Sequence, residues 1–325
     1  MAVYVNTNYS ALQGQRYLGN VQNQLTTTYQ RLSSGMRINS AKDDAAGLQI
    51  ADRLTSQING LNQGNRNASD GIALAQTMEA GMDEISGMLQ KIRTLAVQAN
   101  NGTNTADDRT AISKEMSSLA TEVNRIAMKT TFAGKTILNG QTKEGSIFGD
   151  PAAGGPGAAP GGKLNGEEGT MTLQVGSNKG DTISFKMTSV MFSVVGNGAA
   201  DLIKNTADVI FKTGADGSIE VNLNKADPAA AGKTIGDVIN LMDSMIAVVD
   251  GKRADLGAIQ NRLESSIRNQ SNVAANEADA RSRIRDADFA EESANLTQQN
   301  IIQQAASSML MQANTRPQLG LSLLG

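Results

Sequence analysis

The sequence predicts a mainly α-helical protein: a long, discontinuous helical bundle or coiled-coil rod built from N- and C-terminal segments, with a small β-rich central insert. Two observations support this fold class. Apolar residues recur at alternating steps of three and four along stretches near both ends of the chain, which is the spacing of one helix face. A Gly- and Pro-rich run at 149–162 holds three of the five prolines, so this run favours an extended connector over packed structure.

The first long helix is expected to run from Ile58 to Ala99, because apolar residues keep the helical spacing through that stretch with one short step. The residues Asn-Asn-Gly at 100–102 then supply a stop signal. Thr105, followed three residues later by Asp108, has the pattern of a capping box and predicts that a second helix begins there. The apolar stripe of this second helix is narrow, as in a coiled-coil seam.

A third helix is predicted over 235–263 from the same spacing. A long helix cannot bury one thin seam alone, so the three helices are expected to pack on one another as a rod. The N- and C-terminal thirds would then pair, and the middle of the chain would leave from the rod. Ser40 with Asp43 resembles another capping box. Where two acidic residues are adjacent at a predicted helix start, their favourable interaction with the helix dipole explains them better than a metal site does.

The central insert is predicted to contain two β-hairpins. Apolar residues alternate over 171–175 and 183–187, on either side of a turn at 176–180. A second hairpin is expected with its turn at Asp216-Gly217. The fold of the rest of the insert is left open by the sequence.

The composition excludes several classes of chemistry. The 325 residues include no histidine and no cysteine, so Ser-His-Asp triads, Cys-His pairs, zinc clusters, disulfides and thiol redox chemistry are impossible. No catalytic, cofactor-binding or metal-binding residue is assigned, and an enzyme is not expected. The net charge of −3 provides no global basic field for phosphate backbones, so no nucleic-acid partner is expected.

The sequence gives no sign of membrane insertion. Nowhere do about 18 apolar residues run together, so no membrane partner is expected. The first 30 residues also lack the compact apolar stretch of a secretory signal, because Asn, Gln and Thr interrupt them throughout. We therefore expect a soluble protein that, if exported, leaves by a route without a cleaved signal peptide.

The two ends of the chain are nearly uncharged and rich in apolar residues. Residues 1–36 carry only two arginines, and residues 293–325 carry only one. Three consecutive apolar residues at 309–311 already span about 200° of a helix, and a helix that is apolar on most sides is buried on most sides. We expect these ends to order by packing against copies of themselves. The alternative is that they are simply flexible tails.

Several segments of the sequence resemble the bacterial flagellins. These segments are RLSSGMRINSAKDDAAGL at 31–48, LQVGSNKGDTI at 173–183, SRIRDADFAEE at 282–292 and PQLGLSLLG at 317–325. The similarity covers about 1–140, 171–187 and 236–325. Motifs of this length, placed at both ends of a chain, are specific to the family.

The resemblance implies a structural subunit that self-assembles into the bacterial flagellar filament for motility, outside the cell, after export in an unfolded state through the flagellar type III apparatus. It implies a helical homopolymer, an export chaperone on the C-terminal segment, and contacts with the filament cap and hook-filament junction proteins. The expected polymerisation and chaperone segment contains Leu296, Ile301, Ile302, Met309, Leu310, Leu321, Leu323 and Leu324.

The resemblance also implies three domains. A terminal coiled-coil domain would form the inner core of the filament, a helical rod domain with a β-hairpin would surround it, and a Gly-rich linker with a small variable insert would lie at the surface. In the same order, the domains are expected at 1–40 with 286–325, at 41–140 with 171–187 and 236–285, and at 141–170 with 188–235.

Flagellins are also ligands of a vertebrate Toll-like receptor that contacts their rod helices, and the contact stretch of the family resembles residues 89–98 here. Leu95 and Gln98 match the family pattern, as does Glu115 on the neighbouring helix. Lys91 stands where the family usually has arginine. Because lysine lacks the planar bidentate geometry of arginine, we expect receptor recognition that is retained but weaker.

Two other functions stay open at this point. A hook-filament junction protein shares the helical ends but caps a junction instead of polymerising indefinitely. A secreted helical adaptor or effector would use amphipathic ends to bind a host helix or a membrane surface. The strength of the signature at 31–48 favours a flagellin, and the scarcity of Lys and Arg in the ends disfavours anionic membranes.

Overall fold

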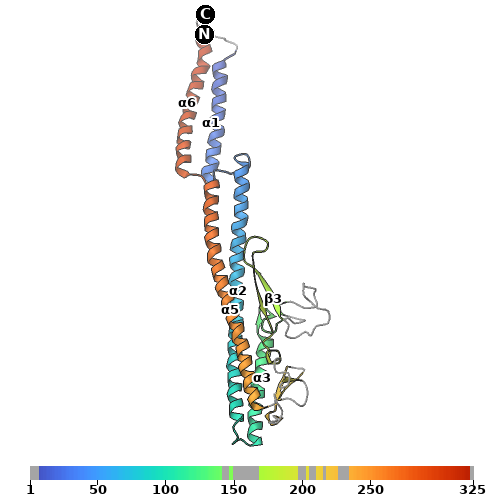
Figure 1. Ribbon diagram of the computed structural model, residues 1–325. Coiled ribbons are helices and arrows are strands. Elements are labelled where there is room, and N and C mark those ends of the chain that lie inside the picture. Colours follow the sequence, from blue (N-terminus) through green and yellow to red (C-terminus); the bar gives the residue numbers. More distant parts are fainter. Residues whose placement is uncertain are drawn as a thin grey trace. The chain divides into compact units, whose positions relative to one another are not determined.

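The computed structural model describes residues 7–140, 146–148, 168–196, 203–204, 210–214, 217–225 and 234–322. The helices are α1 (Tyr9–Ser34), α2 (Ala45–Ala99), α3 (Ala106–Lys129), α4 (Phe192–Val195), the 3₁₀ helix η3 (Leu223–Lys225), α5 (Ile235–Arg285) and α6 (Phe289–Ser322). The strands are β1 (Thr131–Phe132), β2 (Lys135–Thr136), β3 (Gly169–Gln174), β4 (Thr182–Met187), β5 (Ile203–Lys204), β6 (Phe211–Thr213) and β7 (Ile219–Val221). The mainly α-helical fold with a small strand-containing central region is therefore confirmed (Figure 1).

The chain divides into two compact units. The terminal unit contains Met1–Asn59 and Asn272–Gly325, and the central unit contains Gly60–Ser271. The long helices α2 and α5 contribute residues to both units. The three domains expected from the sequence therefore stay a prediction.

In the terminal unit, α1 and α6 lie side by side as an antiparallel pair (Figure 1). The N-cap of α1 is Asn8, whose Oδ1 accepts a hydrogen bond from the Ala11 N–H at 3.1 Å. The same side chain donates from Nδ2 to the Ala313 carbonyl at 2.7 Å and so ties α1 to α6. At its other end α1 stops at Gly35, whose left-handed conformation (φ 69°) suits a residue without Cβ.

The segment that follows α1 is hydrogen-bonded to the segment between α5 and α6. Met36 and Asp286 form an isolated antiparallel bridge. The Arg37 N–H donates to the Arg285 carbonyl at 2.7 Å, and the Ala287 N–H donates to the Gly35 carbonyl at 3.0 Å. These hydrogen bonds hold the end of α1 beside the start of α6.

The predicted capping box of Ser40 and Asp43 does not start a helix, so that prediction is wrong. The Asp43 carboxylate does accept from the Ser40 N–H at 2.9 Å, but this bond closes a turn before α2. The residue that caps α2 is Asp44, whose Oδ1 accepts from the Gly47 N–H at 2.9 Å. In the predicted box Ser40 would be the N-cap and Asp43 the third helical residue, whereas in the structure Asp44 is itself the N-cap, and the backbone conformation decides between the two arrangements.

The predicted helices are present, and two of them extend beyond their predicted limits. α2 begins at Ala45 and not at Ile58, and α5 continues past Leu263 to Arg285. Most residues in these extensions are exposed, so the sequence there has no regular apolar spacing from which the helix could be predicted.

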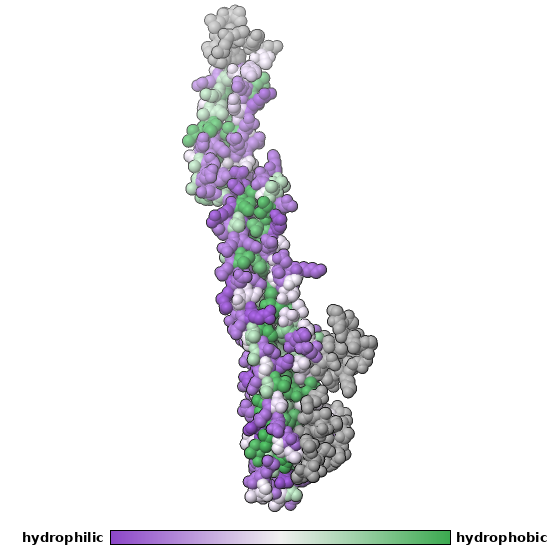
Figure 2. Space-filling model, viewed as in Figure 1, coloured by the Kyte–Doolittle hydropathy of each residue, from purple (hydrophilic) through white to green (hydrophobic). Residues whose placement is uncertain are grey.

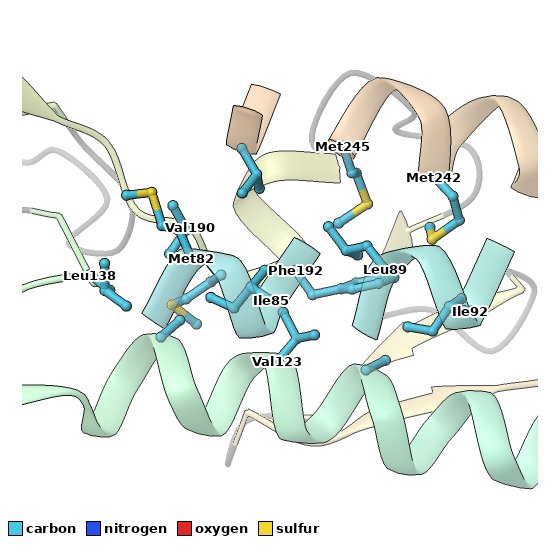
Figure 3. Packing of buried hydrophobic residues seen from close by; sticks show 14 of the residues in the cluster. Met82, Ile85, Leu89, Ile92, Val123, Leu138, Val190, Phe192, Met242 and Met245 are labelled. Carbon is cyan, nitrogen blue, oxygen red and sulfur yellow. The ribbon is translucent and has the colours of Figure 1, made fainter. Parts of the chain in front are cut away.

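The core of the central unit lies between α2, α3 and α5. Met82, Ile85 and Leu89 of α2 are fully buried between Val123 of α3 and Met245 of α5 (Figure 3). This is the helical seam predicted from the apolar spacing, and it confirms that the three helices pack on one another.

The first predicted hairpin is confirmed. Strands β3 and β4 pair in antiparallel register, with Gly169 opposite Met187 and Gln174 opposite Thr182. The hairpin lies directly on α2, because a Cβ at Gly64 would collide with the Val175 carbonyl. Glycine at this position therefore allows the backbone of the hairpin to approach the helix.

The second predicted hairpin is confirmed in part. Strands β6 and β7 are antiparallel, and Gly217 has the positive φ (83°) that its turn requires; Asp216 lies outside the described residues. The structure adds β5, which pairs with β6 in parallel register, a pairing that the sequence did not indicate.

A row of hydroxyl groups on α3 holds the outer edge of β7 and the residues beside it. Four helical residues advance about 6 Å and two strand residues about 6.6 Å, so side chains one turn apart meet alternate strand N–H groups. Each hydroxyl accepts one backbone N–H bond: Ser113 from Leu223 at 3.1 Å, Ser117 from Val221 at 2.8 Å and Thr121 from Ile219 at 3.1 Å. An edge that would otherwise be open to another strand is thereby closed by a helix.

The predicted capping box at the start of α3 is confirmed, and it makes stability depend on pH. Thr105 donates to the Asp108 carboxylate from its hydroxyl at 2.7 Å and from its N–H at 2.9 Å. These hydrogen bonds hold the pKa of Asp108 below its usual value of 3.8. A carboxyl whose pKa is lowered by folding stabilises the protein above its unfolded pKa, and that stabilisation is lost as the pH falls through the folded pKa.

We therefore expect Asp108→Asn to lower the free energy of unfolding at neutral pH, and the difference from wild type to shrink as the pH falls below the ordinary pKa of an aspartate and through the lowered pKa of Asp108. Denaturant unfolding followed by circular dichroism at several pH values measures this. Asp107→Asn is the matched control, because it removes a charge from the same helical turn without altering the capping box. A difference for Asp108→Asn that stays constant into acid would contradict the assignment.

Candidate functional site

The terminal unit buries few apolar side chains, whereas the central unit holds the whole main core. On the α1–α6 pair, only Val21 and Leu25 are buried aliphatic residues among those whose side chains are described. Several apolar side chains lie on the outer surface of the pair, where Figure 2 shows small green areas among purple ones. The large exposed apolar residues are Tyr9, Leu12, Tyr17, Tyr29, Phe289, Ile301, Ile302, Met309 and Met311.

We call these nine exposed residues the terminal apolar surface. They come from two helices that lie side by side, and successive positions differ by about 100° around each helix, so these side chains reach more than one side of the pair. Large apolar side chains left exposed in this number on one helix pair are the candidates for contact with another protein. The aromatic residues of α1 were not among the residues assigned from the sequence, although all four tyrosines of the chain fall within its first 29 residues.

The pair is closed by small and polar contacts. Leu310 packs over Gly14, where an added Cβ would lie 3.1 Å from the Leu310 Cδ1 atom. Arg31 forms an ion pair with Glu292 at 3.0 Å, and the Glu292 side chain is only 9% exposed. The Thr28 hydroxyl, also buried, donates to Gln299 at 3.2 Å. These contacts fix α1 against α6 while leaving the larger apolar side chains outside.

The structure divides the predicted polymerisation segment into two groups. Leu296 and Leu310 are partly buried, so they contribute to packing within the chain. Ile301, Ile302 and Met309 are 62%, 42% and 70% exposed and are free to contact another molecule. Leu321 lies in α6 without a described side chain, and Leu323 and Leu324 lie outside the described residues.

The structure brings together two of the residues predicted to contact a receptor. Lys91 of α2 and Glu115 of α3 form an ion pair at 3.0 Å, with their side chains 58% and 48% exposed. Gln98 is exposed on α2, whereas Leu95 is only 8% exposed and belongs to the core. A partner at this surface would meet the ion pair and Gln98 first.

Polar pairs also join α2 to α5 at the surface of the central unit. Arg93 donates to the Asp243 carboxylate through both Nε and Nη2, which raises the pKa of Arg93. Arg253 pairs with Asp83 at 3.0 Å. The two pairs are ten residues apart on each helix, in opposite chain directions, so α2 and α5 run antiparallel without a change of register between them. The sequence shows the four charged residues but does not show which of them form pairs.

The described residues hold no group of three or more Asp and Glu side chains that could bind a metal ion. Among them, no helix combines the length and apolarity needed to span a lipid bilayer. The distinctive feature of the described residues is the terminal apolar surface.

Comparisons with known proteins agree with this arrangement. Residues 5–143 match the model of the bacterial flagellin N-terminal helical region, and residues 239–324 match the model of the C-terminal helical region. Flagellin D of Vibrio anguillarum is 38% identical and Flagellin A of Vibrio cholerae is 39% identical, each over the full length of both chains.

A solved structure of a putative flagellar hook-associated protein from Vibrio parahaemolyticus has a similar fold. It covers 75% of this chain and all of its own, with a TM-score of 0.52 and 18% identity. At this identity the likeness concerns the fold alone.

Proposed function

The chain belongs to the bacterial flagellins, the structural subunits of the flagellar filament outside the cell, and on this premise we propose that it polymerises through the terminal apolar surface of α1 and α6. As a member of this family it is a structural protein and not an enzyme. The observation that carries the proposal is the contrast between the units: the central unit buries its apolar residues, and the terminal unit exposes its largest ones.

The exposed apolar side chains of the terminal unit favour association with another copy. Burying a large apolar side chain contributes about 1.5 to 3 kcal/mol relative to leaving it exposed. The α1–α6 pair leaves nine such side chains exposed within one chain, so a second copy offers them the burial that the chain itself cannot. The near absence of charge on these helices also limits repulsion between copies that are packed closely.

The proposal includes the route by which the subunit reaches the filament. We infer export in an unfolded state through the flagellar type III apparatus, with a chaperone on the C-terminal segment and the cap and junction proteins at the two ends of the filament. The absence of cysteine supports this route, because no disulfide can trap the chain during transit. The terminal apolar surface supports the binding of a chaperone, because the exposed apolar residues of an unassembled subunit are otherwise prone to aggregate.

Seeded assembly tests the polymerisation proposal. We expect the full chain to elongate sheared filament fragments in a strongly salting-out buffer, and a chain shortened to residues 41–285 to form no filaments, because the shortened chain lacks α1 and α6 but retains the core of the central unit. Negative-stain electron microscopy measures filament length. Long filaments from the shortened chain would refute the role of the terminal helices, and short capped stubs from the full chain would indicate a junction protein.

We also propose that the Lys91, Gln98 and Glu115 surface, with Leu95 behind it, is recognised by the vertebrate Toll-like receptor that binds flagellins. The ion pair between Lys91 and Glu115 supports this proposal, because it places a cation and an anion at fixed positions on neighbouring helices. An ammonium group makes this pair as a point charge, whereas a guanidinium group would bind carboxylates in two parallel hydrogen bonds.

We expect Lys91→Arg to tighten receptor binding about threefold to tenfold, because a guanidinium can hold Glu115 and a receptor carboxylate with separate N–H groups. Surface plasmon resonance with the receptor ectodomain measures the change. Lys186→Arg, at an exposed lysine of β4, is the matched control and should leave binding unchanged. Equal affinities of wild type and Lys91→Arg would remove the proposed reason for weaker recognition.

A further inference from the structure

The methionines of the chain fall into two classes. Of the 14 methionines, all but Met1 lie in the described part of the chain. Eleven of these are buried or partly buried, including Met78, Met82 and Met116, which are fully buried in the core of the central unit. Among the described methionines, only Met309 and Met311 are exposed, at 70% and 65%.

The two exposed methionines lie on opposite sides of one contact. Leu310, between them, packs over Gly14 of α1. Successive helical residues are about 100° apart, so Met309 and Met311 flank the Leu310 contact in opposite directions. Met309 lines a groove between α1 and α6 together with Gly14 and Tyr17. A molecule that docks on either flank of α6 at residues 309–311 therefore meets a thioether sulfur.

We propose that Met309 and Met311 are oxidation sites at which a peroxide turns off the terminal apolar surface of the free subunit. This inference rests on the proposed polymerisation through that surface. In the reaction the O–O bond of hydrogen peroxide breaks, one oxygen forms an S=O bond with the thioether, and the other leaves as water. The sulfur loses two electrons and the peroxide gains them, and the apolar side chain becomes a polar sulfoxide.

The structure makes this modification selective. A peroxide in solution reaches Met309 and Met311, whereas the core sulfurs of Met78 and Met82 have no exposed surface. Assembly covers the terminal apolar surface, so the same two sulfurs become protected once the subunit is in a filament. A sulfoxide formed earlier introduces a polar S=O group where the neighbouring copy requires an apolar one, and the polar group loses its water on docking. The selectivity for these two sulfurs therefore holds in the folded subunit before assembly.

The test uses the full chain treated with hydrogen peroxide and then mapped by peptide mass spectrometry. We expect Met309 and Met311 to be oxidised well before Met78 and Met82, and the same two residues to be protected in preformed filaments. Seeded elongation of the oxidised subunit should be slower by about tenfold. The double variant Met309→Leu with Met311→Leu keeps apolar side chains of similar volume and should elongate equally well before and after peroxide. Treatment with methionine sulfoxide reductases A and B should restore elongation of the oxidised wild type.

Each contrary outcome has its own meaning. If the oxidised wild type elongates as fast as the untreated subunit, or the leucine variant is inhibited just as strongly, the inference is overturned while the proposed function stands. If Met309 and Met311 are oxidised no faster than the core methionines, the selectivity argument fails and the inference with it. If the untreated wild type does not elongate at all, the proposed function itself fails.

Discussion

The double variant Ile301→Gln with Ile302→Gln should prevent filament elongation while leaving the folded monomer intact. Both side chains lie on α6 and are 62% and 42% exposed, so the monomer loses little packing when they become polar. In a filament the same positions would have to bury two amide groups with no partner designed for them, and each unpaired amide costs about 1 to 3 kcal/mol. Repeated at every subunit, this cost stops growth.

Two measurements separate assembly from stability for this variant. Seeded elongation by light scattering and electron microscopy should show no filaments, and the thermal unfolding of the monomer followed by circular dichroism should match wild type. Thr297→Gln is the matched control, because it changes an exposed polar position of the same helix without removing apolar surface. Elongation by the isoleucine variant at the wild-type rate would show that this face of α6 is not part of the assembly surface.

Ile85→Ala should have the largest effect on the stability of the central unit. Ile85 is fully buried between α2, α3 and α5 (Figure 3). Truncating a buried isoleucine to alanine removes its transfer free energy and leaves a cavity, which together cost about 2 to 5 kcal/mol. We expect the midpoint of denaturant unfolding to fall accordingly, with helix content at low denaturant unchanged.

Val97→Ala is the matched control for this substitution. It truncates an apolar side chain of the same helix and the same unit, but Val97 is 50% exposed, so the change in unfolding free energy should be within about 0.5 kcal/mol. Equal losses at Ile85 and Val97 would mean that the three-helix seam does not dominate the stability of the central unit.

The sequence was sufficient to predict the seam shared by α2, α3 and α5, but not the full lengths of α2 and α5 or the pairing of α1 with α6 within one chain. Apolar residues at steps of three and four predicted the seam that contains Ile85 and Leu89, because one face of each helix must be buried and burial leaves a period in the sequence. The capping box of Thr105 and Asp108 was equally visible, since it depends on residues only three positions apart. The hairpin formed by β3 and β4 followed from alternation around a glycine-containing turn.

The sequence alone determined the family, the absence of histidine and cysteine chemistry, and the helical seams, because each of these is local or periodic along the chain. Only the tertiary structure decided which apolar residues of α6 serve the monomer and which are left for a partner. Leu310 and Met309 are adjacent and both apolar, yet one packs over Gly14 and the other is 70% exposed. Likewise, the hydroxyls of Ser117 and Thr121 look like ordinary helix surface until β7 lies beside them. Such contacts join residues far apart in the chain, and no local pattern specifies their distance.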